Sequence, residues 1–329
     1  MKPSNSRRRA FGLIAALIAL GAAPLFIRND FYLDGFILVF LWASFSGAWN
    51  ILGGYAGMVS LGHNAFFAIG AYTSTLLFLR LGVTPWLGMF AGGLLAAAVG
   101  VVLGIVCFRL RSHYFALATL AFGQVVHILT MNWRGLTQGA EGIALPIEPS
   151  LAHMIFASKL AYVYLGFGLF LVVLATAIAI ERSRLGYFLT AFRENEDAAR
   201  ALGVKTGQVR LIAMAISAFL SAIAGTFYAQ YVVYIDPSGV SRLQLSVQVA
   251  LFAIVGGLGT FNGPVIGACI FVPITIALRS YLGTDQPQVN RCIGGLLALI
   301  DVCSRRGGQT REPIQRPRLG QSAARPAVA

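Results

Sequence analysis

Residues 86–108 read WLGMFAGGLLAAAVGVVLGIVCF, a run of 23 residues without a charged side chain. A helix rises about 1.5 Å per residue, so a run of this length can cross a hydrocarbon core about 30 Å thick. Its glycines are spread along the run, as is typical of helices that pack closely in lipid. This stretch predicts a membrane-spanning helix, and it raises the question of how many others the chain contains.

The composition of the whole chain agrees with that interpretation. Of the 329 residues, 57% are hydrophobic and only 11% are charged, against about 25% charged in typical soluble domains. An ordinary soluble enzyme and a disordered chain are both excluded. The formal net charge is +13, but the basic residues form short clusters between apolar runs, a distribution that the positive-inside rule explains. We therefore expect a lipid bilayer as the surroundings and no nucleic acid as a partner.

Ten apolar runs approach the length of a membrane span. They are residues 11–27, 35–53, 58–79, 86–108, 114–132, 160–180, 209–231, 244–258, 263–279 and 289–303. The sequence thus predicts an all-α, polytopic integral membrane helix bundle of about eight to ten transmembrane helices. Two alternatives stay open: residues 244–279 form one broken helix or two, and the first run is a span or a signal peptide, although its length exceeds the usual h-region of about 7–15 residues.

The basic residues also predict the orientation. If the N-terminus lies inside, 18 of the 25 Lys and Arg fall on the inner side, so we expect both termini in the cytoplasm and the protein in the cell inner membrane. Residues 132–159 are then an irregular external loop with room for a short helix, and residues 181–208 are a cytoplasmic loop. A transmembrane domain over residues 1–303 would be followed by a basic, disordered tail over residues 304–329.

The cytoplasmic loop has the pattern of one amphipathic helix. Its apolar positions recur near helical spacing and are Phe188, Phe192, Ala199 and Leu202. Charged residues cover the other side, among them Glu196 and Arg200 at the favourable i,i+4 spacing. Gly203 stands where a C-cap glycine belongs. We expect this helix to lie outside the membrane.

Motifs for catalysis and metal binding do not occur in the sequence. There is no H-E-x-x-H, no C-x-x-C and, inside the predicted spans, no pair of carboxylates at helical spacing, so we expect no catalytic residues, no metal site and no cofactor bound by this chain. The glycine-rich residues 256–264 lack the Gly-Lys-Ser/Thr ending of a nucleotide-binding loop. Their alternative role is a tight turn or break between helices, with structural glycines at Gly256, Gly257, Gly259 and Gly263.

Polar residues inside the predicted spans are the candidates for a translocation path, because hydrocarbon offers them no hydrogen-bond partner. The stretch from Ser60 to Asn64, flanked by structural glycines Gly57 and Gly62, combines polar side chains with a possible break in the helix. The candidates for the path are Ser60, His63, Asn64, Gln124 and Gln248. The alternative is that these groups only bond neighbouring helices.

Residues 53–72 read GGYAGMVSLGHNAFFAIGAY, and this block closely resembles a motif of the larger permease subunit of high-affinity branched-chain amino-acid ABC transporters. Three further blocks resemble the same family in the same order: residues 137–143, 193–196 and 255–268. The resemblance covers roughly residues 30 to 280. The C-terminal end departs from it, because a low-complexity tail replaces the apolar ending of the family.

The cytoplasmic loop is also similar to the coupling motif of ABC importers, with Asp197 in place of its usual glutamate. The resemblance implies that this helix docks on a cytoplasmic ATPase, and the residues assigned to coupling are Glu196, Asp197, Ala198, Ala199 and Gly203. The alternative is a solvated amphipathic linker. The partners implied are a second homologous permease subunit, two ATPase subunits and an external solute-binding protein.

The resemblance implies the function of a membrane subunit that imports leucine, isoleucine and valine, itself without enzymatic activity. Within the same architecture the cargo could instead be urea, short-chain amides or other hydrophobic amino acids. A polytopic membrane transferase is the alternative of a different class, and it would need acid/base or metal ligands at one membrane face. A self-powered secondary transporter would need an intramembrane relay of ionisable groups, in which these spans are poor.

Overall fold

The computed structural model of the chain describes residues 20–282 except 27–28, 111 and 147–149. The predicted span 289–303 and the predicted tail 304–329 lie outside these residues, as do both termini and most of the predicted span 11–27. The last part of that first run forms a short 3₁₀ turn, η1 (Ala23–Phe26).

The architecture is the predicted all-α membrane bundle. Its long helices are α2 (Asp30–Asn50), α3 (His63–Leu81), α4 (Pro85–Cys107), α5 (Ser112–Asn132), α7 (Lys159–Arg182), α10 (Thr206–Val232), α12 (Leu243–Gly257) and α13 (Gly263–Leu282). Among the described residues, seven segments are long and apolar enough to cross a membrane, one of them comprising the short α11 (Pro237–Val240) together with α12. Helix α13 adds a shorter apolar stretch. Residues 244–279 are therefore two helices rather than one broken helix.

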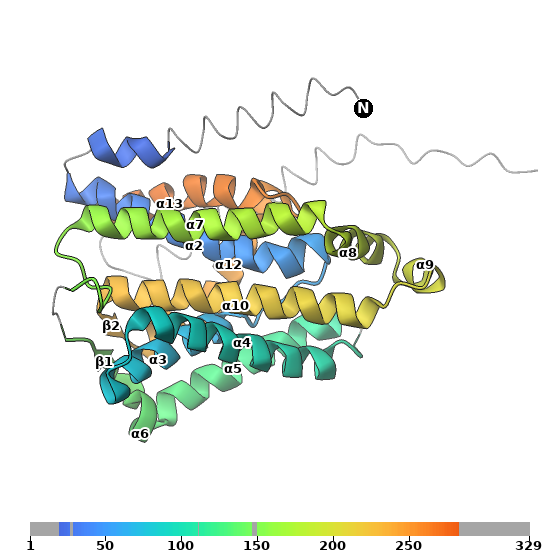
Figure 1. Ribbon diagram of the computed structural model, residues 1–329, viewed down its shortest axis with the longest axis horizontal. Coiled ribbons are helices and arrows are strands. Elements are labelled where there is room, and N and C mark those ends of the chain that lie inside the picture. The colour runs from blue at the N-terminus through green and yellow to red at the C-terminus, as the bar shows by residue number, and fades with distance from the viewer. Residues whose placement is uncertain (1–19, 27–28, 111, 147–149, 283–329) are drawn as a thin grey trace, which may run out of the picture. The chain divides into compact units, whose positions relative to one another are not determined.

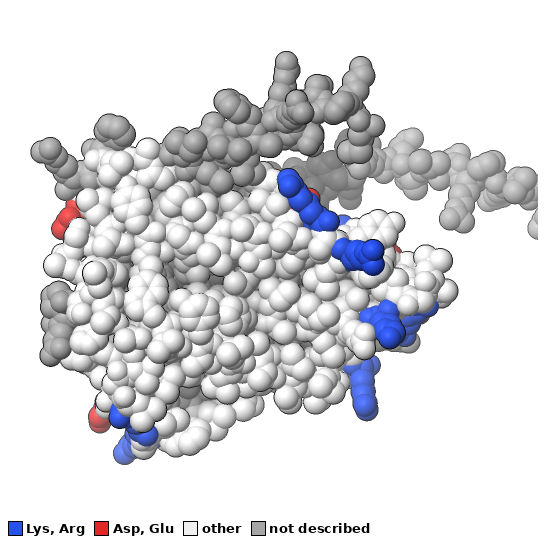
Figure 2. All heavy atoms as spheres, viewed as in Figure 1, with Lys and Arg blue, Asp and Glu red and all other residues white. Residues whose placement is uncertain are grey.

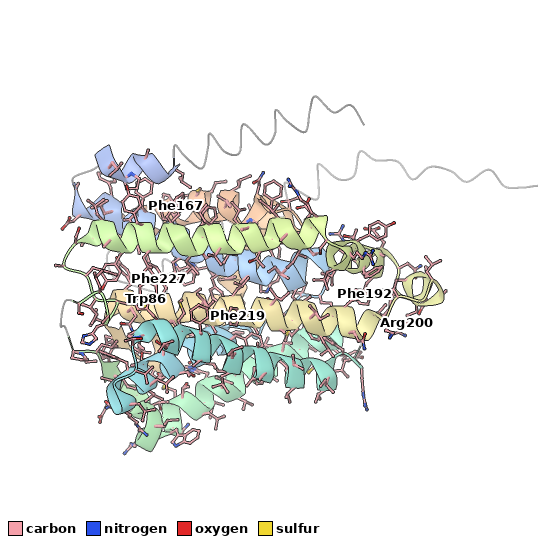
Figure 3. The ribbon with its side chains drawn as sticks, in the orientation of Figure 1. Trp86, Phe167, Phe192, Arg200, Phe219 and Phe227 are labelled. Carbon is pink, nitrogen blue, oxygen red and sulfur yellow. The ribbon has the colours of Figure 1, made fainter. Side chains whose placement is uncertain are left out.

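Helix α10 lies at the centre of the bundle. It packs against α2, α3 and α4, and Figure 1 shows α7 and α2 on one side of it and α3, α4 and α5 on the other. Phe219 and Phe227 project from α10 (Figure 3). Gly93 of α4 makes room for the Phe219 ring, since an added Cβ would come within 2.6 Å of it. The Phe219 ring on α10 thus fits against α4 because Gly93 has no side chain.

Helices α4 and α5 cover one side of the bundle and are less buried than the others. The buried positions of α4 are mostly small, such as Gly88, Gly92 and Ala96. Its exposed positions carry bulky apolar side chains, namely Leu87, Phe90, Leu94, Val102 and Val106. Only 17% of the apolar span of α5 is buried. In a membrane both surfaces must be covered by lipid or by another subunit.

Two helix ends differ from the predicted spans. A π-helical turn, η2 (Ile51–Tyr55), extends α2 to Tyr55. The chain then leaves the helix at Gly57, whose φ of 68° falls in the left-handed region. Helix α3 consequently begins at His63 and not at residue 58 as predicted. Ser60 and Gly62 lie in the connection before α3 rather than within a helix.

The segment 132–159 is irregular and contains a short helix, as predicted. It forms α6 (Arg134–Thr137), the 3₁₀ turn η3 (Gly139–Glu141) and strand β1 (Ile143–Ala144). Strand β1 pairs antiparallel with β2 (Tyr234–Ile235), which follows α10. This pairing ties the loop to the end of the central helix.

The prediction of a single helix across residues 181–208 is wrong. The loop contains two helices, α8 (Arg184–Glu194) and α9 (Glu196–Ala201), separated by Asn195 in an extended conformation. The Asn195 side chain accepts a hydrogen bond of 3.0 Å from the Ala198 amide and so caps α9. Leu202, expected on the buried side, is 84% exposed because α9 begins in a new direction.

Candidate translocation path and coupling segment

The start of α3 is held by a buried hydrogen-bond network around His63. His63 Nδ1 lies 3.0 Å from Ser60 Oγ, and Nε2 lies 2.7 Å from Ser217 Oγ of α10. Ser217 Oγ donates its proton to the Ala48 carbonyl at 2.6 Å, so Nε2 is assigned as a donor and Nδ1 as the acceptor from Ser60. Both ring nitrogens of His63 are engaged, and neither Ser60 nor His63 is exposed.

Asn64 connects three helices at the same level. Its amide N–H donates to Ser246 Oγ of α12 at 2.7 Å, and Ser246 Oγ donates back to Asn64 Oδ1 at 2.9 Å. Its side-chain amide also donates to the Ser241 carbonyl. On the other side Gly123 of α5 lies against the amide, leaving no space there for a Cβ. Asn64 is itself buried.

The two glutamines differ from the other path candidates. Gln124 is exposed on α5, beside Gly123, and Gln248 is half-buried on α12, two residues after Ser246. Neither side chain forms a hydrogen bond with another of the described residues. The structure thus brings together Ser60, His63 and Asn64, which are bonded inside the subunit at the start of α3. Gln124 on α5 and Gln248 on α12 do not join this network, and their side-chain amides have no partner among the described residues.

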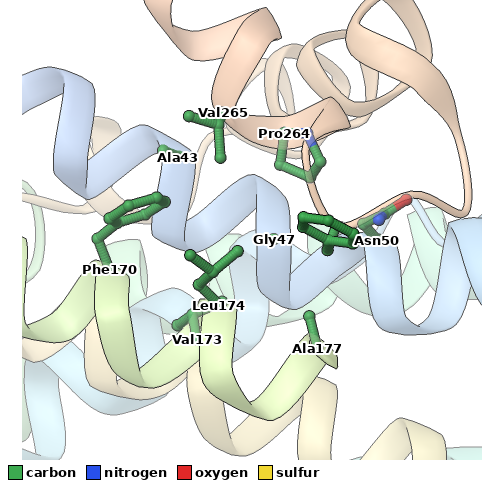
Figure 4. A pocket seen from close by; sticks show the side chains of 10 residues that line it. Ala43, Gly47, Asn50, Phe170, Val173, Leu174, Ala177, Pro264 and Val265 are labelled. Atoms are coloured by element: carbon green, nitrogen blue, oxygen red, sulfur yellow. The ribbon is translucent and has the colours of Figure 1, made fainter. Parts of the chain in front are cut away.

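A small pocket lies among α2, α7 and the start of α13 (Figure 4). Its lining is almost entirely apolar, and the polar side chain in it is Asn50. That amide is already occupied, because it donates to the Thr260 carbonyl at 2.9 Å and accepts from the Gly259 amide at 3.1 Å. The pocket therefore offers no free polar group for the ammonium and carboxylate of an amino acid.

The predicted structural glycines lie at turns and close approaches. Gly256 passes the Gly263 carbonyl so closely that an added Cβ would overlap it, and Gly62 passes the Thr119 carbonyl in the same way. Gly57, Gly257 and Gly259 have positive φ. The stretch 256–263 contains the turn between two apolar helices. This is the role that the sequence offers as the alternative to a nucleotide-binding loop.

The residues assigned to coupling lie on α9 and at its end. The Gly203 amide donates to the Arg200 carbonyl at 2.9 Å and the Val204 amide to the Ala199 carbonyl at 3.1 Å, with φ of 82° at Gly203. These bonds form a Schellman motif, and Gly203 is the C-cap glycine that the sequence predicts. Asp197 and Ala198 are exposed, whereas Ala199 is only 2% exposed and packs into the chain itself.

Helices α8 and α9 both contact Arg210 of α10. Its guanidinium lies over the rings of Phe108 and Phe192, 5.0 and 4.8 Å from their centroids. It also approaches Glu196 at 3.4 Å, and the same carboxylate pairs with Arg200. Figure 3 shows Phe192 and Arg200 together at the end of the bundle where α8 and α9 lie. One buried cation thus contacts both helices of the pair.

On the face that Figure 2 shows, charges lie at the two ends of the bundle. Figure 2 shows a wide belt without charged side chains, and basic residues gathered at the end occupied by α8 and α9. At the opposite end Lys159 pairs with Asp34 at 2.7 Å, and Tyr231 donates to the same carboxylate at 2.9 Å. A charge-free belt between two charged ends is the arrangement that a bilayer requires.

The helix bundle, the charge-free belt and the helix pair outside it define a multi-pass membrane permease. The sequence profile described as "Branched-chain amino acid transport system / permease component" matches residues 31–300. The chain belongs to this family, as its motifs indicated, and is a permease subunit of the branched-chain amino acid type.

Individual relatives agree with that assignment. The branched-chain amino acid permease protein LivM of Escherichia coli is 29% identical, over 93% of this chain and 76% of its own length. LivH of Salmonella typhimurium is 26% identical, over 78% of this chain and 87% of its own length. The autoinducer 2 import permease LsrC of Yersinia pseudotuberculosis is 24% identical, over 84% and 79%. No solved structure is significantly similar to this chain.

Several residues of the site have no signal in the sequence. Ser217, Ser241 and Ser246 hold His63 and Asn64 from 154 to 182 positions further along the chain, and serine in an apolar helix is unremarkable by itself. The contact of Arg193 with Gly54, 139 positions away, is equally unpredictable. Asn50 is an exception, because a neutral amide at membrane depth must find a partner.

Proposed function

We propose that this subunit carries leucine, isoleucine and valine across the cell inner membrane as one of two homologous permeases of an ATP-driven importer. Two cytoplasmic ATPase subunits would supply the energy, and an external solute-binding protein would deliver the cargo. Family membership supports the permease role. That LivM and LivH both resemble this chain supports pairing with a second, homologous permease.

The observation that carries the ATP-driven mechanism is the exposed surface of α9. This short helix lies beyond the bundle (Figure 1) and presents Asp197, Ala198 and Leu202 outward. An almost fully exposed leucine beside a small alanine suits insertion into a groove of another protein. The same end carries the basic residues, and the positive-inside rule therefore favours a cytoplasmic location, where ATPase subunits would bind.

The path would run along the face formed by α5 and α12. Gln124 and Gln248 offer amides that can replace water at the charged groups of an amino acid, and exposed Val125, Ile128 and Val247 offer apolar contact to its side chain. An amide exposed to hydrocarbon is costly, so this face would turn toward the second permease. His63 and Ser60 would hold the start of α3 in place.

The test is reconstitution of the complete importer in liposomes, with the second permease, the ATPases and the binding protein supplied. We expect ATP-dependent uptake of labelled leucine that unlabelled isoleucine and valine compete away, while urea, acetamide and autoinducer 2 do not. Uptake without ATP or driven by a proton gradient alone would contradict the mechanism, and selective competition by urea or acetamide would move the cargo to amides.

A further inference from the structure

Arg193, in the last turn of α8, touches two segments that are distant from it in the sequence, residues 54–57 and Gly259. Its Nη1 donates a hydrogen bond of 3.0 Å to the Gly54 carbonyl in η2. Its aliphatic stem lies on Gly57, where an added Cβ would come within 2.6 Å of Cγ. Its guanidinium lies against Gly259, where an added Cβ would come within 2.7 Å of Nη1.

The surroundings suit an arginine. Carbonyls near the C-terminal end of a helix lack intrahelical partners and carry the negative end of the helix dipole. A planar guanidinium can bond such a carbonyl and still lie flat against neighbouring backbone. Gly57 and Gly259 both have positive φ, so the chain turns on either side of the guanidinium, and neither residue has a side chain to displace it.

Asn50 fastens two of these segments to each other at the same place. It lies at the end of α2 and bonds both Thr260 and Gly259 in the turn between α12 and α13. The end of α2 and that turn therefore form one junction, which we call the 54/57/259 junction after the three glycines that Arg193 touches. Arg193 joins this junction from the cytoplasmic-loop side.

The junction adjoins two helices of the candidate path: it precedes α3 and follows α12. Three residues after Gly57 comes Ser60, bonded to His63 at the start of α3. Gly259 follows α12, which carries Ser246 and Gln248. On its other side, Arg193 is two residues from Asn195, the break between α8 and α9. A single side chain thus stands between the proposed ATPase-docking helix and both segments that lead to the path.

We infer that Arg193 is a positioning residue that transmits movement of α8 and α9 to the start of α3 and the end of α12 through the 54/57/259 junction. The inference rests on the proposed function, since it names the contact by which ATP-driven movement of α9 would reach the membrane helices. A residue that merely capped α2 would stabilise the fold without affecting how much substrate moves per ATP.

The first measurement is amide hydrogen exchange of the full chain in the assembled complex. Arg193→Ala removes the charged donor, and we expect residues 51–62 and 257–262 to exchange about tenfold faster because they lose their shared partner. Arg193→Lys keeps one donor and should show a smaller increase. Arg184→Ala is the matched control: Arg184 is exposed on the same helix and has no hydrogen bond or ion pair with any described residue. Unchanged exchange in both segments would overturn the inference.

The second measurement is leucine uptake per ATP hydrolysed in proteoliposomes. We expect Arg193→Ala to lower this ratio several-fold while ATP hydrolysis continues, Arg193→Lys to restore part of it, and Arg184→Ala to leave it at the wild-type value. Faster exchange with an unchanged ratio would reduce Arg193 to a cap and overturn the transmission role. Failure of the proposed function looks different, because the wild-type complex itself would then show no ATP-driven uptake.

Discussion

His63 of α3 and Ser217 of α10 are joined by a hydrogen bond of 2.7 Å between Nε2 and Oγ, at a place where neither residue is exposed. The Ser217 proton is used for the Ala48 carbonyl, so the imidazole has a fixed donor and a fixed acceptor. A histidine so engaged is a support for the start of α3 and is poorly suited to carrying protons.

Replacing His63 should therefore destabilise the protein. His63→Ala leaves two buried hydroxyls with a lost partner and opens a cavity, and we expect the free energy of unfolding to fall by about 2–5 kcal/mol. Thermal and denaturant unfolding of the purified protein measure this loss. Gln124→Ala, at an exposed position of α5, should cause no comparable fall. A His63→Ala protein as stable as the wild type would contradict the structural role.

The surface of α9 gives a test of docking. Leu202→Glu places a charge on the exposed side of the segment, so we expect a folded, membrane-inserted subunit that no longer retains the ATPases during purification and no longer supports uptake. Leu151→Glu is the control, because Leu151 is nearly as exposed but lies in the segment before α7. Retention of the ATPases by Leu202→Glu would remove α9 from the interface. Ala199 is unsuitable for this test because its side chain is buried within the chain.

Cysteine labelling distinguishes path residues from packing residues. In a variant freed of Cys107, Cys269, Cys292 and Cys303, we expect Gln124→Cys to react with a small water-soluble thiol reagent and to change its reactivity with ATP. Ser60→Cys should stay unlabelled because Ser60 is buried among bonded partners. Labelling at Ser60 together with protection at Gln124 would place the path on the other side of α3.

The charges at the two ends of the bundle predict its orientation in the membrane. Reporter fusions after Gly203 should behave as cytoplasmic and those after Leu151 as external, because basic residues gather at the α8 and α9 end. A translocated reporter after Gly203 would reverse the orientation and remove α9 from contact with any cytoplasmic ATPase.

Much of the architecture could be predicted because membrane spans are signalled locally, by length and by the absence of charge. Every predicted run between residues 35 and 279 coincides with a helix. The errors lie where a local hydrogen bond overrides the pattern. Asn195 ends one helix and caps the next. The apolar repeat that predicts a single helix therefore runs through two helices.

The site was less accessible to prediction, for a different reason. The sequence singles out Ser60, His63 and Asn64 as polar residues within predicted spans, and the structure shows that all three are buried in the protein. Whether such a group lines a path or bonds a neighbour depends on residues such as Ser217 and Ser246, which come from other helices. The sequence shows which polar groups are present but not which of them form hydrogen bonds with one another. These hydrogen bonds distinguish the three buried residues from Gln124, whose side-chain amide has no partner among the described residues.

The contrast between α4 and α5 also predicts how the subunit is rotated about the membrane normal. Helix α4 offers only hydrocarbon-like side chains outward, whereas α5 offers Gln124 among apolar neighbours. We expect α4 to belong to the lipid-facing perimeter and α5 to point toward the axis shared with the second permease. A nitroxide at Leu94 should then collide freely with dissolved oxygen, and one at Gln124 should collide with a water-soluble nickel reagent. The opposite pattern would mean that α5 faces lipid and α4 faces the second permease.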